Sequence, residues 1–257
     1  MNDSTHPSSY EEENLNTDFG FRTVKSKEKP TLVKAVFDSV AYKYDIMNDL
    51  MSLGIHRIWK HIFLKELSPR PSLTLLDLAG GTGDISFGWL KNGGGKAYLT
   101  DINYNMLKIG QTRSLDQGFI NNIHLFCVDG EHISLSDQSV DRVSISFGLR
   151  NCTHKEKVLS EAKRVLKPGG RFLCLEFSKV TLPTLERLYN VWSFQALPRI
   201  GQLVAHDRDS YQYLAESIRT FPNQEKLKSM MEEAGMENVT YKNLSGGIAC
   251  IHSGWRI

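Results

Sequence analysis

The sequence has little of what a secreted or membrane-spanning protein needs. Its 257 residues include only four cysteines, and no two of them form a CxxC pair. Cysteines spaced this widely do not indicate a disulfide framework, and they suit a reducing compartment. No run of about 18 apolar residues occurs, so we expect no membrane-spanning helix. The first 18 residues carry acidic side chains but no lysine or arginine, the opposite of a signal or transit peptide, so neither is expected.

The sequence also lacks a large excess of charge of either sign. Lysine and arginine total 31 against 29 for aspartate and glutamate, a net charge of +2. Nucleic-acid binding needs a concentrated basic face, so we expect no nucleic-acid partner. With 40% hydrophobic residues and a mean hydropathy of −0.32, the composition is that of an ordinary globular domain and excludes disordered and fibrous classes.

The histidines and cysteines do not predict a metal site. Their spacing between residues 124 and 154 fits no standard zinc ligand set, and strand packing or loop polarity explains them more simply. The side chains concerned are His124, Cys127, His132, Cys152 and His154. We therefore expect no bound metal.

Strand and helix patterns alternate along most of the chain. A helical pattern covers about 31–67, and strand-like runs follow at 73–78, 97–100, 123–128, 140–146 and 171–177, with helical segments between several of them. Two last strand-like runs flank Ser245-Gly246-Gly247 as a hairpin. The pattern predicts an α/β fold: a doubly wound, mostly parallel sheet with N-terminal helices and a C-terminal antiparallel hairpin.

We expect one folded domain after an acidic, disordered tail. The tail is assigned to 1–18 and the domain to 19–257. Within the domain the expected parts are N-terminal helices at 19–68, a cofactor-binding core at 69–178, substrate lid helices at 179–236 and the terminal hairpin at 237–257.

A glycine-rich turn follows the first predicted strand. The segment LLDLAGGTGD places Gly80, Gly81 and Gly83 where a strand turns into a helix, and glycine there lets the backbone approach a ligand closely. A tight turn without a ligand is the plainer explanation, because one glycine loop is weak evidence.

Polar residues at the next two strand ends strengthen the ligand interpretation. Asp101 stands about 20 residues after the loop, where a carboxylate can accept the hydroxyls of a ribose. Asp129-Gly130 follows the third strand, where an adenine would lie. Taken singly, Asp101 could cap a helix and Asp129 could be a turn residue.

Two cofactors fit these strand ends. A nicotinamide dinucleotide calls for G-x-G-x-x-G/A, and here Gly81 and Gly83 are followed by Ser86, a partial match. S-adenosylmethionine has no pyrophosphate and makes no such demand. The N-terminal helices and the terminal hairpin also favour the methyl donor, and a nicotinamide-dependent oxidoreductase or a non-catalytic ligand-binding subunit remain as alternatives.

From about residue 19 to the C-terminus the chain resembles the ubiquinone/menaquinone biosynthesis C-methyltransferases of the UbiE type, within the class I S-adenosylmethionine-dependent methyltransferases. Besides the glycine loop, the resemblance is carried by VFDSVAYKYDIMND (36–49), SLGIHRIWK (52–60), SFGLRN (146–151), LKPGGRFLCLEFSK (166–179), LPRIG (197–201), YLAESIR (213–219) and NLSGG (243–247). The resemblance implies a seven-stranded sheet. It also implies methyl transfer to a ring carbon of a polyprenyl benzoquinol, of demethylmenaquinol, or of both, with S-adenosylhomocysteine as product.

The resemblance also assigns site residues. It implies contacts to S-adenosylmethionine from Thr82, Asp101, Asp129, Gly130 and Ser146, and the glycine loop adds Asp77, Gly80, Gly81 and Gly83. Arg150, Asn151 and Tyr44 are expected beside the quinol. Losing a phenolic proton activates the ring, and Asp129 is a candidate base acting through water. Arg150 can stabilise the phenolate but cannot act as a base at ordinary pH.

A polyprenyl substrate places constraints on location. We expect a cytoplasmic protein that rests peripherally on a bacterial inner membrane, in contact with other quinone-biosynthesis proteins and able to form a homodimer. The aromatic stretch from Leu185 to Leu203 is either core or lid, or an apolar surface for the tail and the membrane with Arg187 and Arg199 at its rim.

Overall fold

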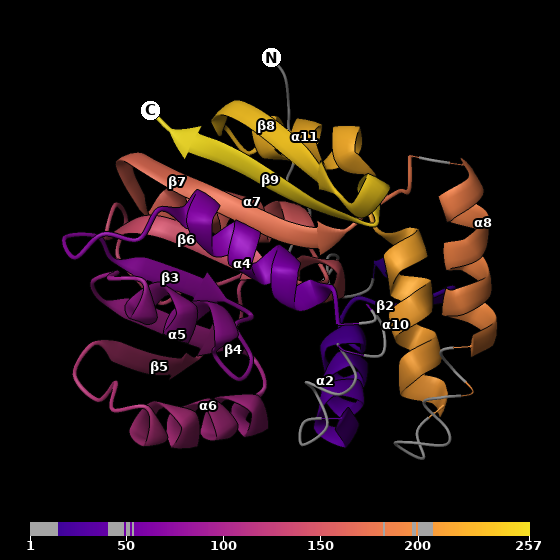
Figure 1. Ribbon diagram of the computed structural model, residues 1–257, viewed down its shortest axis with the longest axis horizontal. Helices are drawn as coiled ribbons and strands as arrows, with labels where there is room; N and C mark the ends of the chain where they lie inside the picture. Colours follow the sequence, from indigo (N-terminus) through magenta and orange to yellow (C-terminus); the bar gives the residue numbers. More distant parts are fainter. Residues whose placement is uncertain are drawn as a thin grey trace.

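A seven-stranded sheet forms the centre of the molecule (Figure 1). The computed structural model describes residues 15–40, 49, 52, 54–181, 183–196, 199 and 208–257. The strands are β3 (Leu75–Leu78), β4 (Ala97–Asp101), β5 (Ile123–Cys127), β6 (Val140–Ser146), β7 (Leu166–Phe177), β8 (Glu237–Leu244) and β9 (Ala249–Arg256). Their order is β5-β4-β3-β6-β7-β9-β8, and β9 alone runs antiparallel to its neighbours. The predicted doubly wound sheet and its terminal hairpin are therefore confirmed.

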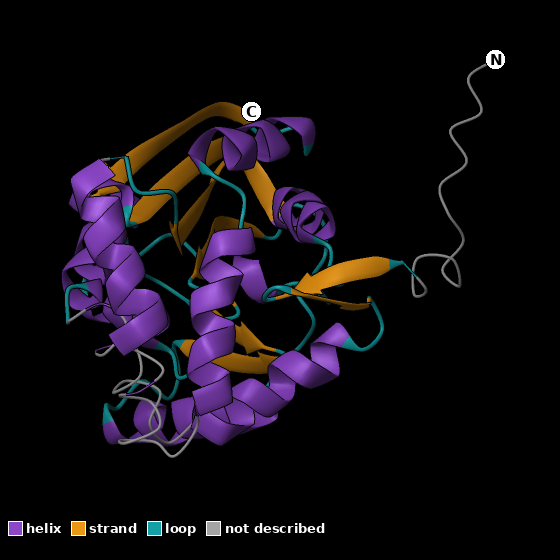
Figure 2. Ribbon diagram, turned by 90° about the vertical axis from the view of Figure 1, so that its right-hand side faces the viewer, coloured by secondary structure: helices purple, strands orange, loops and turns teal. Residues whose placement is uncertain are grey.

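Helices cover both faces of this sheet (Figures 1 and 2). One face carries α4 (His56–Leu67), α5 (Asp84–Lys91) and α6 (Tyr104–Asp116), and the other carries α7 (Lys155–Val165) and α11 (Gln224–Glu233). Beyond the carboxyl ends of the parallel strands lie α2 (Lys29–Val40), α8 (Pro183–Val191) with the π-helical turn η3 (Trp192–Ala196), and α10 (Arg208–Thr220). Short 3₁₀ turns occur at η2 (Leu149–Asn151) and η4 (Ser245–Gly247). Because the strand order reverses between β3 and β6, a ligand site is expected at the same end of the sheet as α2.

Two apolar cores follow from this layering. Trp59 and Phe63 of α4 are buried with Trp89 of α5 on one face, and Val158 of α7 is buried with Met231 of α11 on the other. The apolar residues of each helix recur every three or four positions, so they lie on one side of the helix and pack on the sheet. The pattern that predicts the helices therefore also predicts which of their residues are buried.

The strand β7 begins earlier than predicted. The sequence pattern places this strand at 171–177, but Leu166 already pairs with Val140. The pairing is irregular between Val140 and Arg142, where Gly169 adopts a positive φ of 76°. The proline and glycines thus form an irregular part at the start of the strand rather than a separate loop.

The expected boundary of the acidic tail is also wrong for its last residues. Residues 16–18 belong to strand β1 (Asn16–Phe19), which pairs with β2 (Arg22–Lys25) in a small antiparallel hairpin. Tertiary contacts order this segment: the Phe19 ring stacks on Tyr213 at 4.2 Å, and Asp18 pairs with the fully buried Lys29 at 3.4 Å. Local composition does not show such contacts. The rest of the expected tail, 1–14, lies outside the described residues.

The segment 179–236, expected to form lid helices, divides into two parts. Helices α8 and α10 stand beyond the strand ends, whereas Leu227, Met230 and Met231 of α11 are buried in the core with α7. Helix α11 therefore belongs to the layer that covers the sheet. No helix in the described ranges is long and apolar enough to cross a bilayer.

We predict that Trp59 anchors α4 to the sheet. Its side chain is 2% exposed, its ring meets Phe177 edge-on, and its Nε1 donates to Ser245 Oγ at 3.0 Å. Trp59→Ala should lower the free energy of unfolding by about 3–5 kcal/mol in urea titration. The matched control is Ile58→Ala: Ile58 is 60% exposed on the same helix, and its loss should cost no more than about 0.5 kcal/mol. Equal costs for the two variants would contradict the anchoring role.

Candidate functional site

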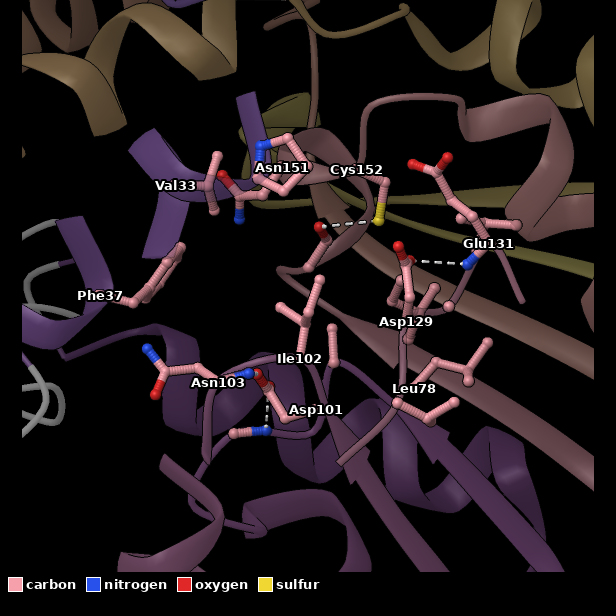
Figure 3. A pocket seen from close by; sticks show the side chains of 18 of the residues that line it. Val33, Phe37, Leu78, Asp101, Ile102, Asn103, Asp129, Glu131, Asn151 and Cys152 are labelled. Carbon is pink, nitrogen blue, oxygen red and sulfur yellow. Dashed lines mark hydrogen bonds between the residues drawn. The ribbon is translucent and has the colours of Figure 1, made fainter. Parts of the chain in front are cut away.

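A cavity of about 840 Å³, partly open to solvent, lies at the carboxyl ends of β3, β4, β5 and β6 (Figure 3). Its floor comes from the strand ends, and Val33 and Phe37 of α2 cover it from above. Of the expected site residues, it is lined by Gly81, Asp101, Asp129, Gly130 and Asn151. Asp101 and Asn151 lie on opposite sides of it (Figure 3).

The glycine loop needs its small residues. A Cβ on Gly80 would come within 2.5 Å of Leu99 and 2.8 Å of Asp77 Oδ2, and Gly81 has a positive φ of 58°. Gly83, with φ of 92°, lines no cavity in the described structure. A Cβ there would meet Phe87 at 2.7 Å, so Gly83 serves the start of α5. Larger residues at these positions would displace the loop.

Asp77 fixes the start of the glycine loop through hydrogen bonds. Its fully buried carboxylate accepts from Ser86 N at 3.1 Å, Ser86 Oγ at 2.8 Å and Ser144 Oγ at 2.7 Å. Burial raises the pKa of Asp77 to about 6, and the three hydrogen bonds oppose that shift. Asp77 therefore joins β3 to α5 and β6 at the point where the loop begins.

Asp101 presents a carboxylate to the larger cavity. Its Oδ2 accepts from Gly81 N at 2.9 Å and its Oδ1 accepts from Asn103 N at 2.8 Å. Burial raises the pKa of Asp101 to about 6, and the backbone hydrogen bonds oppose the shift. Each carboxylate oxygen has two acceptor sites, so Asp101 can still accept from the two hydroxyls of a ribose.

Helix α2 is fastened over this cavity. Asp38 Oδ1 accepts from Asn103 Nδ2 and from Asn105 Nδ2, each at 2.9 Å. The side-chain oxygen of Asn103 caps α6 by accepting from Asn105 N and Met106 N. The same asparagine thus sets the start of α6 and the position of α2.

Asp129 is held by the turn that follows β5. Its Oδ1 accepts from Glu131 N at 2.9 Å, and Glu131 Oε1 in turn accepts from Thr153 N and His154 N. These bonds tie the strand end to the segment after η2, which contains Asn151. Asp129 and Gly130 therefore form one wall of the cavity together with the residues around Asn151.

A second, smaller cavity of about 290 Å³ lies on the other side of the glycine loop. It is lined by Lys60, Asp77, Ala79, Gly80, Thr82, Asp84, Ile85 and Ser146. Ala79 lines both cavities, so the loop backbone is their common wall. The expected cofactor residues thus divide into two groups that meet at one residue.

This division fits S-adenosylmethionine. Its adenosine part suits the larger cavity, with Asp101 for the ribose and apolar side chains for the base, and its amino-acid part suits the smaller and more polar one. The buried Ser146 Oγ has no hydrogen-bond partner among the described residues, and a bound ligand would supply one.

Arg150 does not line either cavity. It is 3% exposed, and its Nη1 pairs with the buried Glu176 Oε2 at 3.0 Å and also donates to Phe147 O at 2.5 Å. Burial raises the pKa of Glu176, and the charge of Arg150 opposes that shift. Removing Arg150 would leave a buried unpaired carboxylate, so lost activity in an Arg150 variant would not by itself identify a contact with substrate.

Asn151 does reach the larger cavity, and Tyr213 holds it there. The Tyr213 hydroxyl donates to Asn151 Oδ1 at 3.1 Å. Tyr44, the third residue expected near the quinol, lies outside the described residues. Among the described residues, no group of three or more histidine, cysteine, aspartate or glutamate side chains is placed to hold a metal ion.

Several residues of the site were not predicted. They are Lys60, Asp38, Asn103, Glu176 and Tyr213, and four of them stand in motifs that carried the resemblance: Asp38, Lys60, Glu176 and Tyr213. Polar residues inside those motifs were the available signal. Their partners are 62 to 67 residues away for Tyr213 and Asp38, so spacing alone could not pair them.

Comparisons with known proteins agree with this geometry. Residues 22–256 match the model of the ubiE/COQ5 methyltransferase family. The chain is 62% identical over 240 residues to the ubiquinone/menaquinone biosynthesis C-methyltransferase UbiE of Acidiphilium cryptum, covering 93% of this chain and 96% of that protein. It is 52% identical over 243 residues to the protein of the same name from Brucella abortus, covering 93% and 90%.

Solved structures are similar at the level of the fold. A SAM-dependent methyltransferase from Thermotoga maritima superposes with a TM-score of 0.62 at 18% identity, covering 88% of this chain and all of that one. This likeness confirms the class I methyltransferase fold. The match over nearly the whole chain decides between the open alternatives and favours the methyltransferase over the nicotinamide-dependent oxidoreductase. The chain belongs to the ubiE/COQ5 methyltransferase family.

Proposed function

We propose that the protein transfers a methyl group from S-adenosylmethionine to a ring carbon of a polyprenyl benzoquinol, of demethylmenaquinol, or of both. The observation that carries this proposal is the pair of cavities that share Ala79 in their linings, because most of the expected cofactor residues divide between them as the two halves of this cofactor require. The names of the relatives, which are ubiquinone/menaquinone biosynthesis C-methyltransferases, support the same substrates.

The bound cofactor supplies an electrophilic methyl group on a sulfonium, and the protein's part is to hold and align. Asp101 would accept from the ribose hydroxyls, and Asp129 and Gly130 would border the base. Thr82 and Ser146 would hold the amino-acid end. Val33 and Phe37 cover the larger cavity with apolar side chains, which would limit the access of water to a reactive quinol anion.

Asn151 is the residue of this chain best placed to orient the quinol. Its Oδ1 is held by Tyr213, so its amide N–H groups are available to donate to a phenolic oxygen of the ring. Asp129 lines the same cavity and accepts the phenolic proton through a water. Arg150 acts through position: its Nη1 and backbone N–H both bond to Glu176, which fixes the turn that carries Asn151.

Asp101 predicts a pH-dependent affinity for the cofactor product. Its pKa is about 6, and only the carboxylate form accepts from both ribose hydroxyls, so affinity for S-adenosylhomocysteine should fall as the pH drops from 8 to 5. Asp101→Asn should bind about 10- to 100-fold more weakly at pH 8. Calorimetric titration at several pH values measures both effects. The affinity of the variant should also lose the part of its pH dependence that is due to Asp101. If affinity plotted against pH ran parallel for the variant and the wild type, the assignment would be contradicted.

Asn151→Ala should lower kcat by about 100-fold, because it removes a donor to the developing phenolate. Tyr213→Phe keeps the ring that stacks on Phe19 but loses the hydroxyl that holds Asn151, and it should lower kcat by about 10-fold. Turnover is measured with a short-tailed demethylated quinol under reducing conditions. Both variants should bind S-adenosylhomocysteine within about twofold of the wild type. An Asn151→Ala protein with normal kcat would overturn this role.

A membrane-facing surface follows from the polyprenyl substrate. Phe21, Val191 and Phe194 are 61%, 54% and 38% exposed, and the rings of Phe21 and Phe194 stack at 6.0 Å. Arg22 and Arg187 are exposed close to them in sequence. Tyr189, which the aromatic pattern suggested for this surface, is only 8% exposed beneath Arg219 and is not available for it.

The bilayer contact is tested by co-sedimentation with phosphatidylethanolamine/phosphatidylglycerol vesicles. Replacing Phe21, Val191 and Phe194 together by serine should lower the partition coefficient about tenfold. The matched control replaces Leu115 and Ile120, which are 59% and 64% exposed in and just after helix α6, and should bind as the wild type does. Equal binding by the two variants would remove the proposed surface.

Other expectations stay predictions: a cytoplasmic location at the inner membrane, a homodimer, and contact with other quinone-biosynthesis proteins. Light scattering of the purified protein, with and without vesicles, gives the oligomeric state directly.

A further inference from the structure

The smaller cavity contains one basic side chain, Lys60 of α4, among the described residues that line it. The motif SLGIHRIWK includes this lysine, and neither the fold nor the proposed chemistry has yet given it a role. Its side chain is 14% exposed, and its Nζ lies 2.7 Å from Asp84 Oδ2. An ammonium can donate to more than one acceptor, and Asp84 is one acceptor of Lys60.

The charges around Asp84 do not cancel. Arg113 Nη2 lies 2.7 Å from Asp84 Oδ1, so this one carboxylate is flanked by two cations. Burial opposes ionisation of Asp84, but the nearby charges of Lys60 and Arg113 outweigh it, and the pKa of this carboxyl lies well below its usual range. These three side chains carry one more positive than negative charge, and the carboxylate of Asp77 in the same lining also interacts with the charge of Lys60. Lys60 is therefore the side chain of this lining that can attract an anionic ligand group.

Lys60 and Arg113 face different surroundings. Arg113 Nη1 donates to Thr82 O and to Thr82 Oγ1, so it braces the glycine loop, and it is not among the residues that line the smaller cavity. Lys60 does line the cavity, as does Ser146, whose Oγ has no hydrogen-bond partner among the described residues. The neighbouring Trp59 is buried and hydrogen-bonded to Ser245, which fixes the helix that presents Lys60.

We propose that Lys60 binds the α-carboxylate of the methionine half of S-adenosylmethionine, with Ser146 beside it. This inference rests on the proposed function. Adenosine in the larger cavity directs the rest of the cofactor past Ala79, the one residue common to both linings. The amino-acid end then reaches a site that offers a fixed ammonium for its carboxylate, an arrangement that gives a charge-assisted hydrogen bond.

The experiment compares two ligands that differ only in the carboxylate: S-adenosylhomocysteine and its decarboxylated amine, 5′-deoxy-5′-(3-aminopropylthio)adenosine. In the wild type, loss of the carboxylate should weaken binding about 10- to 100-fold by calorimetry. Lys60→Met should weaken the binding of S-adenosylhomocysteine by a similar factor. The affinity of this variant for the amine should stay within about twofold of the wild-type value. In this variant the two ligands should therefore bind almost equally.

Matched variants separate this role from support of the loop. Arg113→Met removes the other cation that pairs with Asp84. Because Arg113 does not line the smaller cavity, this variant should change the affinities for both ligands by the same factor. Lys60→Arg keeps the charge and should restore most of the preference for the carboxylate. If Lys60→Met weakens both ligands equally, or neither, the inference is overturned. Where Lys60→Met does not fold, Lys60→Gln gives the same comparison.

Failure of the cofactor assignment would look different. If the wild type bound neither ligand, the proposed function would fall, and Lys60 would fall with it. If the wild type bound both ligands with equal affinity, the cofactor would stand and only the role of Lys60 would be lost.

Discussion

The site depends on one buried carboxylate. Asp77 stands at the end of β3 with no access to solvent, and its oxygens take three hydrogen bonds from Ser86 and Ser144. A buried carboxylate without hydrogen bonds would destabilise the fold, so the bonds from α5 and β6 are required for its burial. They set where the chain leaves the sheet, and hence where the loop that separates the two cavities must run.

Charge is arranged differently at the two ends of the loop. At the adenosine end, Asp101 is bound by backbone N–H groups alone and keeps a raised pKa. At the other end, Asp84 is saturated by Lys60 and Arg113, and its pKa is lowered. Neutral hydroxyls suit the first environment and an anionic group suits the second. One loop of glycines thus separates two environments in which a carboxylate is held by different kinds of donor.

The sequence predicts the sheet, its hairpin and the strand-end acidic residues because these depend on local patterns. Strand and helix periods repeat within a few residues, and the loop, Asp101 and Asp129 each follow a strand directly. Contacts between distant segments could not be found this way. The pairing of Arg150 with Glu176 joins two strand ends 26 residues apart, and it turns an expected substrate contact into a buried ion pair. Likewise the pairing of Asp18 with Lys29 orders residues that composition assigns to a tail. Long-range partners decide such cases, and they depend on the assembled fold.

The way α2 is fastened bears on how quickly the enzyme can turn over. Val33 and Phe37 cover the larger cavity, and the carboxylate of Asp38 secures the helix to Asn103 and Asn105. These two bonds therefore set how firmly the helix covers the cavity. If a ligand leaves on the side covered by α2, its residence time should depend on the strength of the bonds at Asp38 as well as on its own contacts.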